Sequence, residues 1–186
     1  MFTGEKVAQM AAYFMSKEAE PQMAILKLVK LLYLADRESI DMYDEPISFD
    51  YMVSMQHGPV LSRTLDLING FVRDRNADQW DAWIFDRESH NVALKKSASR
   101  DRLDHLSDAD IEVLAAVWDK FGHMNKWEIR NYTHEHLDEW SDPGGSSMPI
   151  SEIELLRALG RSEEEANEIA QAICEQRQLD RVISQV

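Results

Sequence analysis

The sequence lacks the features that disulfide-bonded, membrane-spanning and secreted proteins need. It contains a single cysteine, Cys174, so no internal disulfide can form, and we expect a cytoplasmic protein in a reducing compartment. No apolar run approaches the roughly 18 residues of a membrane-spanning helix. The opening residues also lack the apolar core of a signal peptide, so no secretory leader is expected.

Basic residues are scarce as well. The chain has 20 lysines and arginines against 34 aspartates and glutamates, and its formal net charge is −14. A nucleic-acid binder needs a basic footprint to release counterions, and an anionic membrane surface repels an acidic protein. We therefore expect no nucleic-acid partner and no membrane partner. A basic protein partner is compatible with this charge, and so is a role in solubility alone.

Sequence motifs for catalysis, metal binding and cofactor binding are also missing. The chain has no GxSxG elbow, no phosphate loop with its Lys-Ser/Thr, no HExxH and no cysteine-rich ligand set. His134 and His136 are two residues apart, and on a helix they point about 200° apart, so they could share a metal ion only on a strand. We expect no catalytic residue, no metal site and no cofactor. The alternative that the residues leave open is a small metal-dependent hydrolase using His57, His134 and carboxylates.

What is present is helical spacing of apolar residues. The stripe from Ile25 to Ala35 predicts the most apolar helix of the chain, which we place at the centre of the fold. Lys27, Lys30 and Arg37 lie off that stripe, and Pro21 suits the first turn of the same helix. Further helices are expected over residues 5–17, 61–72, 107–122, 125–136, 150–160 and 162–179.

Three short segments have strand patterns instead. Residues 49–55 alternate between apolar and polar side chains, and residues 83–85 and 92–94 predict a β-hairpin across a polar turn. The predicted fold class is therefore mainly α, of the α+β type. It is a helical bundle around the central helix with a small three-stranded antiparallel sheet.

The charge distribution suggests a division of the chain. Residues 134–186 hold twelve acids and four bases, which is −8 of the total charge of −14. SDPGGSSMP, residues 141–149, is the clearest loop or linker. We expect a domain over 1–140, a loop over 141–149, and an acidic helical extension over 150–186 that packs on the same domain or engages a partner.

The segment QHGPV joins a predicted strand to a predicted helix. Gly58 permits the backbone geometry of a reversal, and Pro59 can preset the first helical turn that follows. No second catalytic group is spaced to serve His57. We interpret the segment as a corner, with His57 on a rim that touches a partner.

Taken together, these motifs resemble the SocA-like Panacea domain of bacterial and phage antitoxins. They are residues 30–36 (KLLYLAD), Pro46-Ile47, Gly58-Pro59-Val60, and Thr133-His134 with Trp140, in this order within residues 5–140. The resemblance implies a non-enzymatic antitoxin that binds a cognate toxin, expected from an adjacent gene. In part of the family it implies an adaptor that delivers the toxin to an ATP-dependent AAA+ protease.

The family also occurs in phages, so a phage or prophage interaction protein without a toxin partner is the alternative. The motif residues that we expect to bind the partner are Tyr33, Asp36, His57, Gly58, Pro59, Val60, His134 and Trp140.

Overall fold

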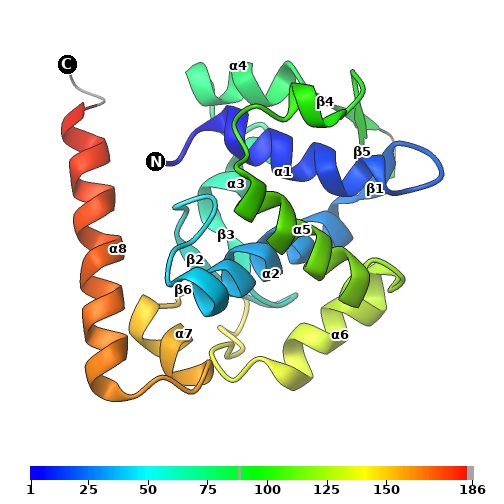
Figure 1. Cartoon of the computed structure of the whole chain (residues 1–186). Coiled ribbons are helices and arrows are strands. Elements are labelled where there is room, and N and C mark those ends of the chain that lie inside the picture. Colours follow the sequence, from blue (N-terminus) through cyan, green and yellow to red (C-terminus); the bar gives the residue numbers. More distant parts are fainter. Residues whose placement is uncertain (88, 184–186) are drawn as a thin grey trace.

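The computed structural model describes residues 1–87 and 89–183, and the fold is mainly helical with short antiparallel strands, as predicted (Figure 1). In chain order the elements are α1 (Gly4–Ser16), β1 (Gln22–Ala24), α2 (Ile25–Tyr43), β2 (Met52–Met55), β3 (Val60–Leu61), α3 (Ser62–Ile68), α4 (Arg75–Asp81), β4 (Ile84–Arg87), β5 (Asn91–Leu94), η1 (Arg100–Arg102), α5 (Asp108–Phe121), α6 (Lys126–His136), β6 (Ser147–Pro149), α7 (Glu152–Ala158) and α8 (Glu163–Ile183).

Helix α2 is the centre of the fold, which confirms the sequence prediction. It packs against α1, α5, α6 and α7, and Leu28 and Leu31 are fully buried. Two of its lysines, which the periodicity placed off the apolar stripe, are buried as well: Lys27 is 9% exposed and Lys30 is 1% exposed. That expectation is wrong because neighbours cover α2 on more than one side, so an off-stripe position on this helix need not face water.

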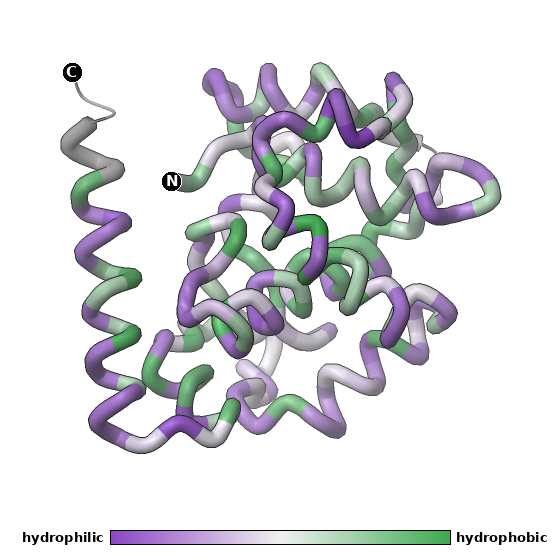
Figure 2. Tube along the Cα trace, viewed as in Figure 1, coloured by the Kyte–Doolittle hydropathy of each residue, from purple (hydrophilic) through white to green (hydrophobic). Residues whose placement is uncertain are grey.

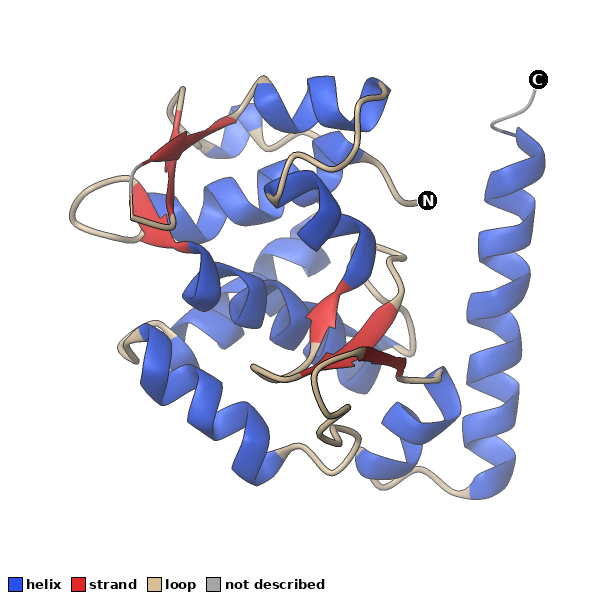
Figure 3. Ribbon diagram, turned by 180° about the vertical axis from the view of Figure 1, so that it is seen from behind, coloured by secondary structure: helices blue, strands red, loops and turns tan. Residues whose placement is uncertain are grey.

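The predicted strands are real but belong to two different sheets (Figure 3). The hairpin β4–β5 is extended by β1, in the order β1-β5-β4. Pro21 therefore does not open the central helix. Its carbonyl accepts a hydrogen bond from the Leu94 N–H at 2.9 Å, and α2 begins only at Ile25. Pairing with β5 holds residues 22–24 in an extended conformation that helical periodicity alone could not show.

The second sheet has the order β3-β2-β6. Val53 on β2 lies opposite Val60 on one side and Pro149 on the other. Pro59 thus precedes a short strand rather than the first turn of α3, which corrects the prediction for that proline. The predicted loop 141–149 likewise ends in strand β6, because β2 supplies a partner for its backbone.

Helix starts are largely where capping residues predict them. Ser107, Asn125 and Ser151 each form a capping box with the acid at the third helical position. Ser162 and Glu165 bond reciprocally in the same way at the start of α8. Helix α4 was not predicted, although the Asp74 side chain caps its first N–H groups.

The C-terminal helices contact the rest of the chain in different ways. Leu155 and Leu156 of α7 are fully buried in the core. Helix α8 stands at one side of the molecule, and most of its residues are hydrophilic (Figures 1 and 2). Only Ala166 and Ile173 of the described α8 side chains are buried, and Arg177 donates to the Asp50 carbonyl at 2.7 Å. None of the helices described is long and apolar enough to cross a membrane.

Candidate partner-binding site

The HGP corner, His57-Gly58-Pro59, turns the chain from β2 into β3. The Gly58 N–H donates to the Met55 carbonyl at 2.9 Å, which closes a tight turn. Gly58 has a φ of +90°, a conformation in which a side chain is strained. The corner is therefore a backbone feature that depends on glycine, and His57 is the exposed residue at its tip.

Other motif segments hold this corner from behind. The Lys30 Nζ of α2 donates to the Pro59 carbonyl at 2.8 Å, and the Trp140 indole N–H donates to the Met55 carbonyl at 3.0 Å. A Cβ atom on Gly58 would lie 2.5 Å from the Thr133 Oγ1 of α6. Three sequence segments that are far apart in the chain thus meet at one place, and their contacts fix the corner's shape.

Positive charge gathers behind the corner. Burial and, to a smaller extent, the positive charge of the neighbouring Arg130 together lower the pKa of Lys30 to about 7. Burial also lowers the pKa of His134, with Arg130 and Lys30 acting in the same direction and the His57 backbone opposing them. The His134 ring stacks on Trp140 with centroids 4.0 Å apart.

This arrangement bears on the hydrolase alternative. A metal cation placed at His134 would be repelled by Arg130 and Lys30, the same charges that lower the pKa of the ring. In the described part of the chain, no three histidine, cysteine, aspartate or glutamate side chains converge as metal ligands. The surroundings of His134 therefore suit an anionic neighbour better than a cation.

A second buried contact ties the segment before Trp140 to α2. The Tyr33 hydroxyl donates to Glu139 Oε1 at 2.9 Å, and Arg37 Nε donates to the same oxygen at 2.8 Å. The Glu139 side chain has no exposed surface. Burial raises the pKa of Tyr33 well above its ordinary value, and the Glu139 charge adds to this shift. Tyr33 therefore acts as an internal donor that positions the Glu139–Trp140 segment.

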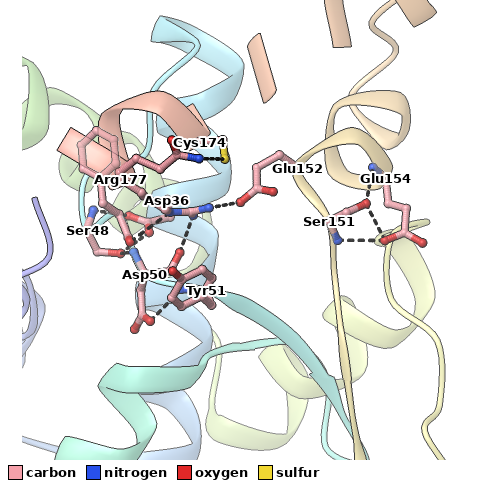
Figure 4. Close-up of polar contacts among 11 residues, drawn as sticks. Asp36, Ser48, Asp50, Tyr51, Ser151, Glu152, Glu154, Cys174 and Arg177 are labelled. Carbon is pink, nitrogen blue, oxygen red and sulfur yellow. Dashed lines mark hydrogen bonds and ion pairs between the residues drawn. The ribbon is translucent and has the colours of Figure 1, made fainter. Parts of the chain in front are cut away.

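Asp36 belongs to a separate cluster on the next turn of α2 (Figure 4). It accepts hydrogen bonds from the Ser48 backbone N–H at 2.9 Å and from the Ser48 hydroxyl. Asp50 accepts from the backbone N–H of Thr64 at 2.8 Å and so caps the start of α3. Burial raises the pKa of Asp36 to about 7, and burial also raises the pKa of Asp50.

The Asp36 shift has a measurable consequence for stability. Its folded pKa of about 7 exceeds the unfolded value of about 4, so the folded state binds the proton more tightly. This contribution is complete below about pH 4 and is lost as the pH rises to about 7. In the Asp36→Asn variant this titrating group is absent. We therefore expect its free energy of unfolding to fall less between pH 4 and pH 7 than that of the wild type. Urea unfolding of both proteins across this range checks it, and parallel pH profiles would contradict it.

A pocket of about 570 Å³ lies beside the corner, between the start of α2 and the start of α6. We call it the corner pocket, and the residues that define it here are Ile25, Val29, Lys30, His57, Lys126 and Trp127. Trp127 is 53% exposed. The corner pocket is thus a hollow beside the HGP corner with an exposed aromatic side chain at its edge.

The structure brings together most of the expected partner-binding residues, but most of them are buried and do not form an exposed surface. His57, Gly58, Pro59, Val60, His134 and Trp140 gather around the corner, Tyr33 lies behind them with Glu139, and Asp36 lies in the separate Ser48 cluster. Of these eight, His57 alone is exposed, and His134 and Trp140 are half-buried. Direct contact of these residues with a partner stays a prediction. In this conformation the buried ones shape the surface instead.

The sequence interpretation missed Lys30, Lys126 and Trp127 as features of this site. Lys30 was set aside as an off-stripe residue, although a lysine within the most apolar helix is a signal that its amino group has a buried hydrogen-bond partner. Trp127 directly follows Lys126 at the start of α6, and the sequence alone does not show that this helix opens onto the corner.

Comparison with known proteins identifies one matching family model. The model described as the antitoxin SocA-like, Panacea domain matches residues 28–141. The match runs from the first turn of α2 to the residue after Trp140 and so covers every segment that builds the corner. No curated protein and no solved structure matches the chain significantly.

Proposed function

The chain belongs to the SocA-like Panacea antitoxin family, and on that premise we propose that it neutralises a cognate toxin by direct protein–protein binding. The toxin is the product of an adjacent gene, and both proteins act in the cytoplasm. The observation that carries the proposal is the structural role of the motif residues. Lys30 and Trp140 donate to the Pro59 and Met55 carbonyls on either side of Gly58, so they hold a shaped surface rather than presenting reactive groups to a substrate.

The charge of the chain supports binding by complementarity. A net charge of −14 attracts a basic partner over a distance and speeds its encounter, and added salt weakens this effect. The same charge opposes binding to the promoter DNA of its own operon. A salt-sensitive band shift with that DNA would overturn this last statement.

Co-expression tests the proposal. The adjacent gene is placed under a graded promoter, with and without this chain, and growth is followed. We expect growth to stop with the adjacent gene alone and to recover when this chain is made. The control carries an early stop codon in the antitoxin gene, so that its RNA is made without protein. A toxic neighbour that this chain does not rescue would contradict the proposal. A harmless neighbour inside a prophage would favour a phage interaction protein.

The placement of α8 favours a second, related function as a proteolytic adaptor. Helices α6 and α8 lie at opposite ends of the molecule in both ribbon views (Figures 1 and 3). An adaptor needs one surface for the toxin and another for the ATP-dependent protease. Leu179 on α8 is 58% exposed, so α8 offers an apolar side chain for such a second surface.

Truncation after Ser162 separates the two functions, because it removes α8 and keeps the buried residues of α7. We expect toxin binding to survive and the cellular half-life of the toxin to lengthen several-fold. Leu179→Asp is the finer variant, since it changes only an exposed side chain. Toxin turnover that is as fast with both variants as with the full chain would exclude α8 from delivery.

A further inference from the structure

The corner pocket differs from the rest of the chain in its chemistry. Ile25, Val29 and Val60 contribute apolar walls. Its charged lining residues are Lys30 and Lys126, joined by the imidazoles of His57 and His90. Among the described residues that line it there is no aspartate and no glutamate, although the chain as a whole carries −14. The pocket is therefore an apolar hollow with a cationic edge in an otherwise acidic protein.

The shape and exposure of the pocket suit a peptide segment. Its volume of about 570 Å³ lies within the roughly 300–1,000 Å³ typical of ligand pockets, which is room for a few side chains. Trp127 stands at its edge with 53% of its surface exposed, and tryptophan is one of the residue types enriched at the energetic centres of interfaces. Lys126 and Arg130 lie near the Trp127 ring, so the aromatic surface is flanked by cations.

We propose that the corner pocket binds a segment of the toxin in which an apolar side chain is flanked by a carboxylate. The apolar side chain packs against Ile25 and Val29 beside Trp127, and the carboxylate lies against Lys126. The proposal rests on the proposed antitoxin function and deepens it by assigning the contact surface and the chemistry that it recognises.

The cationic edge of the pocket, in an otherwise acidic protein, fixes which segment of the partner binds there. The acidic surface attracts any basic protein, but only a partner with a locally acidic and apolar segment satisfies the pocket. A uniformly basic protein would leave Lys126 facing like charge. The pocket thus selects the cognate toxin among the basic proteins that the overall charge attracts.

Binding measurements on two pocket variants test the proposal. Trp127→Ala removes the exposed anchor and Lys126→Glu reverses the charge at the edge, and neither side chain is fully buried. We expect each to weaken binding of the purified product of the adjacent gene by about 10-fold or more in isothermal titration calorimetry. Lys126→Met should cost less than Lys126→Glu, because it removes the attraction without adding repulsion.

Two exposed residues away from the pocket provide matched controls. Tyr43→Ala removes an aromatic side chain at the other end of α2, and Arg75→Glu reverses a charge at the start of α4. Both should bind within about twofold of the wild type, since surface changes outside an interface have little effect.

The outcomes separate the two proposals. Tight wild-type binding that both pocket variants lose and both controls keep supports the pocket and the antitoxin function together. Wild-type binding that the pocket variants retain in full overturns the pocket assignment and leaves the antitoxin function standing. Wild-type protein that does not bind the toxin at all overturns both.

Discussion

Gly58→Ala is expected to lower the free energy of unfolding by about 3 kcal/mol or more. Two costs add at this position. The φ of +90° strains any residue with a Cβ atom, at about 1–3 kcal/mol. The new Cβ would also lie 2.5 Å from Thr133 Oγ1 and 3.0 Å from Lys30 Nζ, and overpacking of this kind adds about 1–3 kcal/mol. Urea unfolding followed by tryptophan fluorescence measures the sum.

Gly160→Ala is the matched control for backbone strain alone. Gly160 has a φ of +85°, and a Cβ atom there would meet no heavy atom within 4 Å. The difference in free energy of unfolding between the two variants therefore measures the crowding of the new Cβ atom against α2 and α6. Equal losses in both variants would show that this crowding contributes nothing. If Gly58→Ala kept full stability but lost toxin binding, the corner would itself be the contact surface.

Glu139→Ala is expected to destabilise the fold by about 3–5 kcal/mol. The carboxylate is the shared acceptor for the Tyr33 hydroxyl and for Arg37 Nε, and its side chain is fully buried. Its removal leaves a buried donor and a half-buried guanidinium without their acceptor, which is the costly way to break an internal ion pair. Thermal and urea unfolding would show the loss, and the tryptophan fluorescence of the folded variant should differ from that of the wild type, because Trp140 is the next residue.

Two variants bracket this effect. Glu139→Gln keeps an oxygen that accepts from both donors, so it should cost much less than the alanine variant. Glu163→Ala breaks the Arg157–Glu163 pair, whose side chains are 53% and 64% exposed, and should change stability by less than about 1 kcal/mol. A loss for Glu139→Ala as small as that for Glu163→Ala would mean that this buried network does not hold the Trp140 segment.

The helices were predictable because their signals are local. The stripe from Ile25 to Ala35 marked the central helix, and the helices predicted over 107–122 and 125–136 begin in the structure at the capping residues Ser107 and Asn125. These signals lie within a few residues of the structure that they specify. The short helix α4 was missed because it has only seven residues and one buried side chain, Trp80, which is too little for a periodic pattern.

The sheets were only partly predictable because their strands are completed from a distance. The hairpin of β4 and β5 is local and was found. Strands β1, β3 and β6 are two or three residues long and exist because a partner strand supplies their hydrogen bonds. The three predicted strands therefore appeared to form one sheet, whereas β2 pairs with β3 and β6 in a second one.

The site shows the same limit. The HGP corner was identifiable from Gly58 and Pro59, but the contacts that hold it come from Lys30 and Trp140, whose roles depend on the folded arrangement. The corner pocket was not predictable at all. Its walls come from α2 and β3 and its edge from α6, and no single stretch of sequence records that they meet.

The most direct test of the central claim is a titration of purified toxin with this chain, following toxin activity and complex formation together. Binding without chemistry predicts that activity falls in proportion to the amount of complex. It also predicts that inhibition ends at a fixed stoichiometry, and that toxin released from the complex by denaturation has an unchanged mass. Complete inactivation at a small fraction of that stoichiometry, or a toxin cleaved or altered in mass, would contradict the account and point to a hydrolase.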